Sequence, residues 1–125
     1  MGQLRVFLVE DNPAIRTTLI PSLELFTGAT VLAWAETEQG AVNWLSTHCR
    51  AWNLAVIDLF LAQGTGIEVV RFCRERAAHQ RVAVLTNDAT DALREECLKA
   101  GADRFFDKGV ELEDFLQYCA SASRG

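Results

Sequence analysis

The chain alternates between short apolar runs and longer segments that are apolar on one helical face. The apolar runs cover residues 4–9, 30–35, 53–57, 82–85 and 104–107. Largely apolar runs of this length are typical of strands buried on both faces. Five such strands in series, separated by helices, predict an α/β domain with a doubly wound, five-stranded parallel sheet flanked by five helices.

The segments between the strands carry helix start and stop signals. The first helix is predicted to begin after Asn12, a good N-cap, and to end at Gly28. Thr65 and Glu68 have the spacing of a capping box, and the buried stripe of the helix that they begin is predicted to reach Ala77. The apolar face predicted for the first helix consists of Ile15, Leu19, Leu23 and Phe26.

Polar residues that could carry chemistry directly follow the first, third, fourth and fifth predicted strands. In a parallel sheet flanked by helices, ligands bind at the edge where the strands have their carboxyl ends. We therefore expect these side chains to meet at one edge of the sheet. They are Glu10 and Asp11, Asp58, Thr86 and Lys108.

Asp58 is the most informative of these residues, because it follows four apolar residues and precedes three more. An isolated carboxylate in apolar surroundings is costly, so it has to be paired, bound to a metal or placed at the open end of its strand. Three acids at one edge would also repel one another. A hard divalent cation relieves this repulsion, and Mg²⁺ suits carboxylate ligands best. Thr86 and Lys108 are suited to holding the oxygens of a phosphoryl group beside the metal, with Asp58 as the nucleophile.

Length and composition restrict the class of protein. A chain of 125 residues, half of them hydrophobic, is sufficient for one domain with a real core. The net charge of −5 argues against direct binding of nucleic acid. Since the sequence contains no long apolar run and begins on a strand, we expect neither a membrane span nor a signal peptide. Cys49, Cys73, Cys97 and Cys119 lack metal-site spacing and are predicted to be small buried hydrophobic residues in a reducing cytoplasm.

Taken in order, these residues resemble the receiver domain of response regulators over essentially the whole chain. Each motif is weak alone, but the ordered set is specific. It comprises Glu10-Asp11 after the first strand, Asp58 after the third, Gly66 eight residues later, Thr86, Gly101-Ala102-Asp103 and Lys108.

The resemblance implies a flavodoxin-like sheet with strand order 2-1-3-4-5 and assigns a role to each site residue. Asp58 accepts the phosphoryl group, and Thr86 and Lys108 bind it. Asp11 and Asp58 ligate Mg²⁺ directly, Glu10 does so mainly through water, and the backbone carbonyl of Phe60 completes the protein ligands. Thr86 and the aromatic Phe105 form a switch that changes the face made by the fourth helix, fifth strand and fifth helix.

The resemblance also implies the partners and the cellular setting. The phosphodonor is a histidine kinase or a histidine phosphotransfer protein, and a downstream protein is the target. We expect residues 1–125 to be one receiver domain without an output domain, cytoplasmic, and either monomeric or dimeric on phosphorylation. Such a domain catalyses only its own phosphorylation and dephosphorylation, so it is not an enzyme in the usual sense.

This sequence departs from the family pattern at four positions near the site. Ala62 stands where the family often has Pro, and Gly109 where it has Pro or Ser, which leaves open whether a cis peptide follows Lys108. Asn87 is larger than the usual Ala or Gly, and Phe105 lacks the hydroxyl of Tyr. None of these changes removes a group that the chemistry requires.

Two other classes of protein fit parts of the pattern. A receiver-like binding module that works without phosphorylation is compatible with the bulky Asn87. A flavodoxin-like or phosphatase-like enzyme fits less well, because Glu10-Asp11 would repel a flavin phosphate, and Phe60 stands where such a phosphatase needs a second Asp. A yellow colour or multiple-turnover hydrolysis would indicate the enzyme class.

Overall fold

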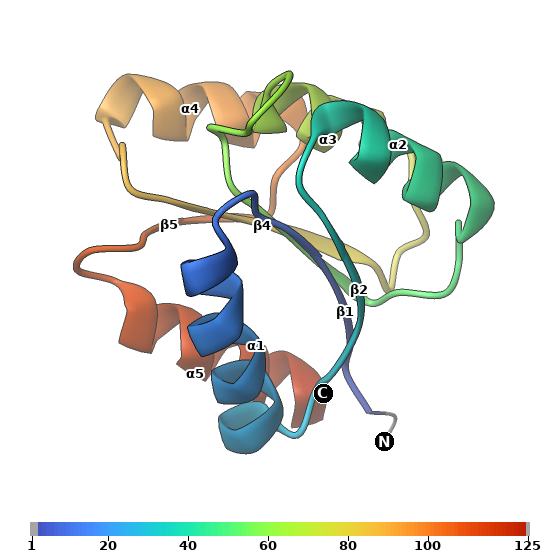
Figure 1. The fold of residues 1–125 in the computed structure, drawn as a ribbon, viewed down its shortest axis with the longest axis vertical. Helices are drawn as coiled ribbons and strands as arrows, with labels where there is room; N and C mark the ends of the chain where they lie inside the picture. Colours follow the sequence, from blue (N-terminus) through green and yellow to red (C-terminus); the bar gives the residue numbers. More distant parts are fainter. Residues whose placement is uncertain (1–2, 125) are drawn as a thin grey trace.

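The computed structural model describes residues 3–124, which form one parallel sheet with helices on both faces (Figure 1). The strand order is β2-β1-β3-β4-β5, as the resemblance implies. The strands are β1 (Arg5–Val9), β2 (Thr30–Ala35), β3 (Leu54–Ile57), β4 (Arg81–Thr86) and β5 (Arg104–Asp107). The predicted fold is therefore confirmed, with strand bounds that differ by one residue at most.

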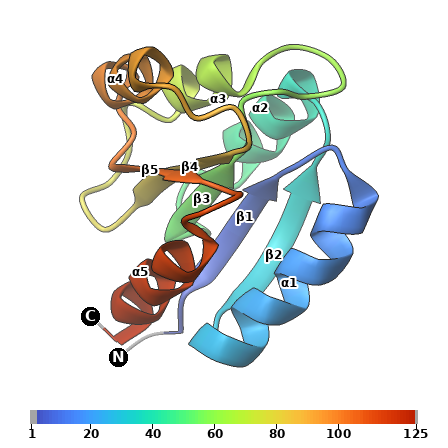
Figure 2. The same ribbon diagram turned by 90° about the vertical axis from the view of Figure 1, so that its left-hand side faces the viewer.

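Two helices cover one face of the sheet and three cover the other (Figure 2). The helices are α1 (Pro13–Thr27), α2 (Glu38–Thr47), α3 (Gly66–Phe72), α4 (Asp91–Ala100) and α5 (Leu112–Arg124). Side chains of α1 and α5 pack with Leu8, Val56 and Phe106 in one core cluster. Those of α2, α3 and α4 pack with Phe7, Ile57 and Val84 in the other. Because alternate strand residues face opposite sides, both clusters draw on the same strands.

The buried face of α1 differs from the predicted one at its two ends. Asn12 caps the helix through its side chain, and Gly28 ends it in the left-handed conformation, as predicted. Phe26, however, is 68 % exposed, whereas Arg16 is buried together with Leu19 and Leu23. The buried face of α1 therefore includes a charged residue, Arg16, that the apolar pattern did not predict to be buried.

Helix α3 is shorter than the sequence predicted. It ends at Phe72, and the amide of Cys73 bonds to the carbonyls of both Val69 and Val70, which tightens the last turn. The Arg76 side chain donates hydrogen bonds to the carbonyls of Cys73 and Gln80. These bonds hold residues 73–80 in a conformation that does not continue the helix. Ala77 is therefore not on a helix, and the predicted extent is wrong.

The capping box predicted at the start of α3 is also absent. Thr65 is the N-cap, but its side chain makes no capping bond. Its amide instead donates to Glu38 Oε1 at 3.0 Å, while Glu68 pairs with Arg71. A long-range contact with α2 has replaced the local one.

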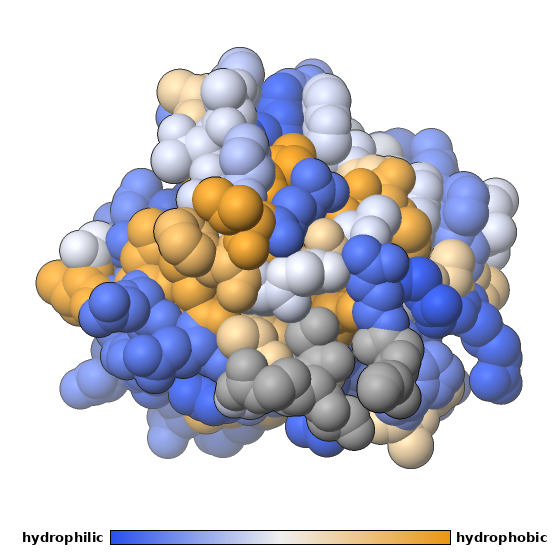
Figure 3. All heavy atoms as spheres, turned by 90° about the horizontal axis from the view of Figure 1, so that it is seen from below, coloured by the Kyte–Doolittle hydropathy of each residue, from blue (hydrophilic) through white to orange (hydrophobic). Residues whose placement is uncertain are grey.

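The face formed by α1 and α5 is partly apolar (Figure 3). Helix α1 and the chain leading into α5 carry four exposed large apolar side chains, namely Leu25, Phe26, Val110 and Leu112. Leu25 and Phe26 lie in the last turn of α1, and Val110 and Leu112 lie just before and at the start of α5, so these exposed side chains form two separate pairs. Within residues 3–124, no helix is long and apolar enough to cross a membrane.

The four cysteines differ in exposure, which corrects the prediction that all are buried. Cys73, Cys97 and Cys119 are buried, whereas Cys49 lies exposed just after α2. Burial raises the pKa of Cys73 and Cys97 to about 11 and that of Cys119 to about 12. The three buried thiols are thus protonated and shielded at neutral pH.

We predict that one thiol of the native protein reacts rapidly with a thiol reagent at pH 8 and that three react only on unfolding. The thiolate is the reactive form, and a pKa of 11 or more leaves little of it at that pH. Labelling with iodoacetamide followed by mass spectrometry measures this. Cys49→Ser is the matched control and should abolish the rapid reaction. Rapid labelling of that variant would contradict the buried placement of the other three.

Candidate functional site

The backbone brings the polar ends of β1, β3 and β5 to one edge of the sheet. The amide of Asp58 donates to the carbonyl of Val9 at 3.0 Å, and the amide of Glu10 donates to the carbonyl of Ala35 at 2.9 Å. On the other side, the amide of Lys108 donates to the carbonyl of Thr86 at 2.9 Å. These bonds continue the sheet ladders one residue beyond the strands, so the side chains leave the sheet from fixed backbone positions.

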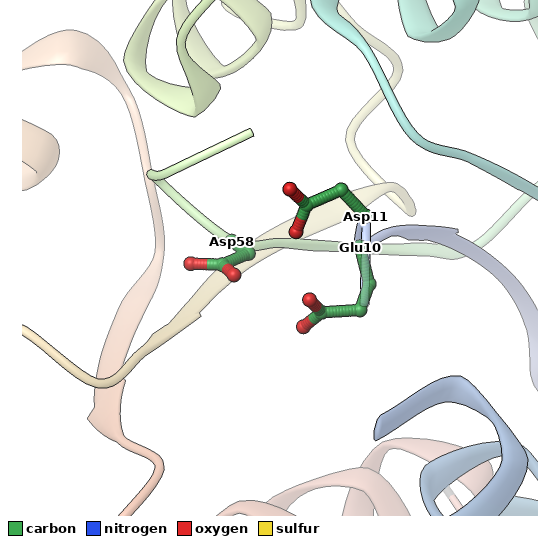
Figure 4. Close-up of side chains that lie close together, drawn as sticks. All are labelled: Glu10, Asp11 and Asp58. Atoms are coloured by element: carbon green, nitrogen blue, oxygen red, sulfur yellow. The ribbon is translucent and has the colours of Figure 1, made fainter. Parts of the chain in front are cut away.

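Three carboxylates meet at this edge (Figure 4). One oxygen each of Glu10, Asp11 and Asp58 lies within 4.8 Å of the others. Glu10 and Asp58 are buried, with 2 % and 8 % of their surface exposed, and Asp11 is partly buried. Glu10 and Asp11 extend from the end of β1 with their carboxyl groups turned toward Asp58 (Figure 4).

Lys108 supplies the positive charge that this cluster requires. Its Nζ donates to Glu10 Oε1 at 2.7 Å and to Asp58 Oδ2 at 3.3 Å. The lysine side chain is only 9 % exposed, so these bonds lie in surroundings where charges interact strongly. The ammonium therefore joins the ends of β1, β3 and β5.

The pKa of Glu10 reflects the same surroundings. Burial raises it above its ordinary value, the hydrogen bond from Lys108 lowers it, and the charge of Asp58 raises it further. The amide of Asn12 also donates to Glu10 Oε2 at 3.2 Å. The net direction is upward, because burial and the charge of Asp58 outweigh the hydrogen bond from Lys108.

The loop after Asp58 is packed closely against its backbone. The amide of Phe60 donates to Asp58 Oδ1 at 3.3 Å, and Phe60 forms an isolated bridge with Thr65. A Cβ atom on Gly66 would lie 2.0 Å from the carbonyl oxygen of Asp58, so only glycine fits there. Phe60 as a whole is 52 % exposed.

Thr86 and Phe105 lie next to this edge on neighbouring strands. Both are buried, with 0 % and 3 % of their surface exposed. Arg94 of α4 donates to the carbonyl of Phe105 at 3.0 Å and lies 4.8 Å from the centroid of its ring. Arg94 therefore links both the backbone and the ring of Phe105 to α4. Asn87 is exposed beyond Thr86, and no cis peptide occurs within residues 3–124, including the one after Lys108.

The donor groups fit a divalent cation with oxygen ligands. Carboxylates and backbone carbonyls are the ligands that Mg²⁺ and Ca²⁺ take, and three acids exceed what one lysine can neutralise. The cluster is the one group of three or more potential ligands found in the part of the chain that the structure describes.

Two residues that support the site were not anticipated from the sequence. Arg16 donates to the carbonyl of Glu10, and Glu38 ties the loop after Asp58 to α2 by accepting from Thr65. The spacing of Arg16 to Leu19 and Leu23 was the available signal, since it places the arginine on the buried face of its helix. No sequence signal linked Glu38 to a loop 27 residues away.

A family model describes almost the whole chain. The model for the response regulator receiver domain matches residues 6–120. The chain belongs to this family. It is a receiver domain, a signalling domain of two-component systems, and its acidic edge is where receiver domains bind Mg²⁺.

A curated relative agrees with this assignment, and solved structures share the fold. The receiver domain is 33 % identical to the photosynthetic apparatus regulatory protein RegA of Rhodobacter capsulatus over 87 % of this chain and 57 % of that protein. It superimposes on the response regulator domain of Thermotoga maritima CheB with a TM-score of 0.84 at 19 % identity, covering 99 % and 98 % of the two chains. A Burkholderia pseudomallei response regulator gives a TM-score of 0.79 at 22 % identity, over 98 % and 70 %. The chain spans about half the length of the curated relatives it matches.

We predict that Lys108→Met destabilises the metal-free protein by about 3 kcal/mol, because it leaves two buried carboxylates without their cation. Adding Glu10→Gln to that variant should recover most of the loss, because the repulsion falls with the charge. Urea unfolding in the presence of a chelator measures both. Lys99→Met, at an exposed position on α4, is the matched control and should change little. Equal effects of the two lysine substitutions would contradict the role given to Lys108.

Proposed function

We propose that Asp58 is the phosphoacceptor and that the phosphodonor is a phosphohistidine of a histidine kinase or a histidine phosphotransfer protein. The observation that carries the proposal is the cluster of three carboxylates joined by Lys108 at the carboxyl edge of the sheet. Glu10, Asp11, Asp58 and the backbone carbonyl of Phe60 would hold Mg²⁺. The ion supplies neutralisation of phosphoryl charge beside the carboxylates.

The chemistry of the transfer follows from the groups present. A carboxylate oxygen of Asp58 attacks phosphorus, the bond from phosphorus to the histidine nitrogen breaks, and the imidazole leaves with that electron pair. Lys108 and Thr86 would bind phosphoryl oxygens, one as a point charge and one as a hydrogen-bond donor. The ammonium has three donors and uses two of them on Glu10 and Asp58, so one remains for a phosphoryl oxygen. Hydrolysis of the acyl phosphate returns the carboxylate, so the domain catalyses only its own modification.

Related structures support this chemistry. The Burkholderia pseudomallei regulator contains a phosphorylated aspartic acid and a calcium ion, and the DrrB receiver domain was solved activated by BeF3. We infer that the present receiver domain works in the same way and controls a downstream protein rather than nucleic acid directly, in keeping with its net charge of −5. Monomers, or dimers formed on phosphorylation, both fit this role.

Phosphorylation of the purified protein by acetyl phosphate with Mg²⁺ tests the proposal. We predict that intact-mass spectrometry shows one added phosphoryl group that hydroxylamine removes. Asp58→Asn or a chelator should abolish the adduct, and Asp91→Asn, which changes an exposed acid on α4, should not. Wild-type protein that gains no phosphoryl group from acetyl phosphate or from a phosphorylated histidine phosphotransfer protein would favour the phosphorylation-independent binding module. Multiple-turnover hydrolysis would indicate an enzyme.

We further propose that Thr86 and Phe105 form the switch. Phosphate on Asp58 would draw the Thr86 hydroxyl toward it, and the Phe105 ring would respond in the space that this opens. Because Arg94 contacts both the ring and the carbonyl of Phe105, the change would reach α4 and the face that it makes with β5 and α5. A phosphate can shift this equilibrium only by its different affinity for the two states.

We predict that beryllofluoride with Mg²⁺ changes the Phe105 rotamer and the position of α4, as seen by crystallography or by methyl and aromatic NMR shifts. Thr86→Ala should reduce the change, because it removes the hydroxyl that follows the phosphate. If the metal-free and beryllofluoride-bound proteins share one Phe105 rotamer and one α4 position, the proposed switch is wrong.

A further inference from the structure

Arg16 is a buried arginine on the face of α1 that packs against the sheet. Only 8 % of its surface is exposed, and its helix neighbours at this depth are Leu19 and Leu23. Burying a guanidinium is costly unless charged or polar partners satisfy it. A chain that places arginine where its helix pattern calls for an apolar residue therefore requires a specific set of partners.

The guanidinium has three partners from separate parts of the chain. Nη1 donates to the carbonyl oxygen of Glu10 at 2.8 Å, and Nη2 lies 3.0 Å from Glu36 Oε2. The Cζ atom lies 3.8 Å from the centroid of the Trp34 ring. The guanidinium thus links the residue after β1 to Trp34 near the end of β2 and to Glu36 just beyond it. Lysine could not make these three contacts at once.

The bond to Glu10 fixes the peptide group between the two acids of the site. The amide of Glu10 is already held by the carbonyl of Ala35 at 2.9 Å. With Arg16 on its carbonyl, both peptide groups of Glu10 are fixed, and the direction in which the chain carries Asp11 is fixed with them. Orienting groups behind the ligands of a metal ion commonly govern its affinity.

We propose that Arg16 is a positioning residue for the divalent-cation site: through the Glu10 carbonyl it holds the Glu10–Asp11 peptide so that both carboxylates face Asp58. The inference rests on the metal site proposed above. It concerns a residue that touches neither the cation nor the phosphoryl group.

A positioning role and a purely electrostatic role of Arg16 predict opposite changes in Mg²⁺ affinity when the side chain is removed. A positive charge near a cation site weakens cation binding, so a purely electrostatic role predicts tighter Mg²⁺ binding once the charge is gone. Glu36 already offsets part of that charge. A positioning role predicts weaker binding, because the Glu10–Asp11 peptide becomes free to turn. The direction of the change distinguishes the two.

The test is isothermal titration of the full chain with Mg²⁺ at fixed ionic strength. We expect Arg16→Met to bind Mg²⁺ about tenfold more weakly than wild type. Arg76→Met is the matched control, because the Arg76 side chain is also largely buried, bonds to backbone carbonyls and pairs with Asp103. Arg76 lies at the opposite edge of the sheet, where β4 and β5 begin, so its loss should reduce stability and leave Mg²⁺ affinity unchanged.

The outcomes separate this inference from the proposed function. Unchanged or tighter binding by Arg16→Met overturns the positioning role, as does an equal loss in both arginine variants. Wild-type protein that does not bind Mg²⁺ would instead overturn the metal site and, with it, the inference. If Arg16→Met does not fold, Arg16→Lys retains the charge but not the fork, and wild-type affinity in that variant would overturn the role.

Discussion

Electrostatic repulsion among three carboxylates at one sheet edge is the constraint on which the rest of the site depends. The parallel sheet imposes it, because the ends of β1 and β3 are neighbours in the hydrogen-bonded ladder. Lys108 relieves part of the repulsion by bonding to Glu10 and Asp58, yet the pKa of Glu10 is still raised. Three acids beside one lysine leave the metal-free site under-neutralised, and this is the physical reason for which we propose that it binds a cation.

The opposite edge of the sheet shows what the same fold does without such a constraint. There the buried Gln80 side chain donates to the carbonyls of Cys49 and Trp52. The Asp103 carboxylate accepts hydrogen bonds from the Arg76 side chain and from the amide of Val82. These polar groups are paired by complementary partners, so they stabilise the fold and leave no uncompensated charge. The acidic edge gives up part of that stability for chemistry, as functional sites commonly do.

The sequence was sufficient to predict the strands and the residues at their ends, because both depend on local patterns. Apolar runs define buried strands, and the parallel topology then brings Glu10, Asp58 and Lys108 together without further information. The predictions that were wrong concern features set by contacts between separate elements, which local patterns do not contain. Helix α3 ends early, and Arg76 holds the chain beyond it through the carbonyls of Cys73, Gln80 and the distant Gly101. At the start of α3, Glu38 from another helix accepts from the Thr65 amide in place of Glu68. Arg16 was missed because an apolar pattern has no place for a buried charge whose partners lie on other elements.

The dependence of stability on Mg²⁺ is the most direct measure of whether the three carboxylates form a cation site. A ligand that binds only the folded state adds about 1.4 kcal/mol for each tenfold rise in concentration above its dissociation constant. Urea unfolding of the unphosphorylated protein over a series of Mg²⁺ concentrations, with ionic strength held constant by NaCl, measures this gain. We predict that the free energy of unfolding rises with Mg²⁺ in wild type and rises much less in Asp11→Ala. A free energy of unfolding that does not change with Mg²⁺ would contradict this prediction.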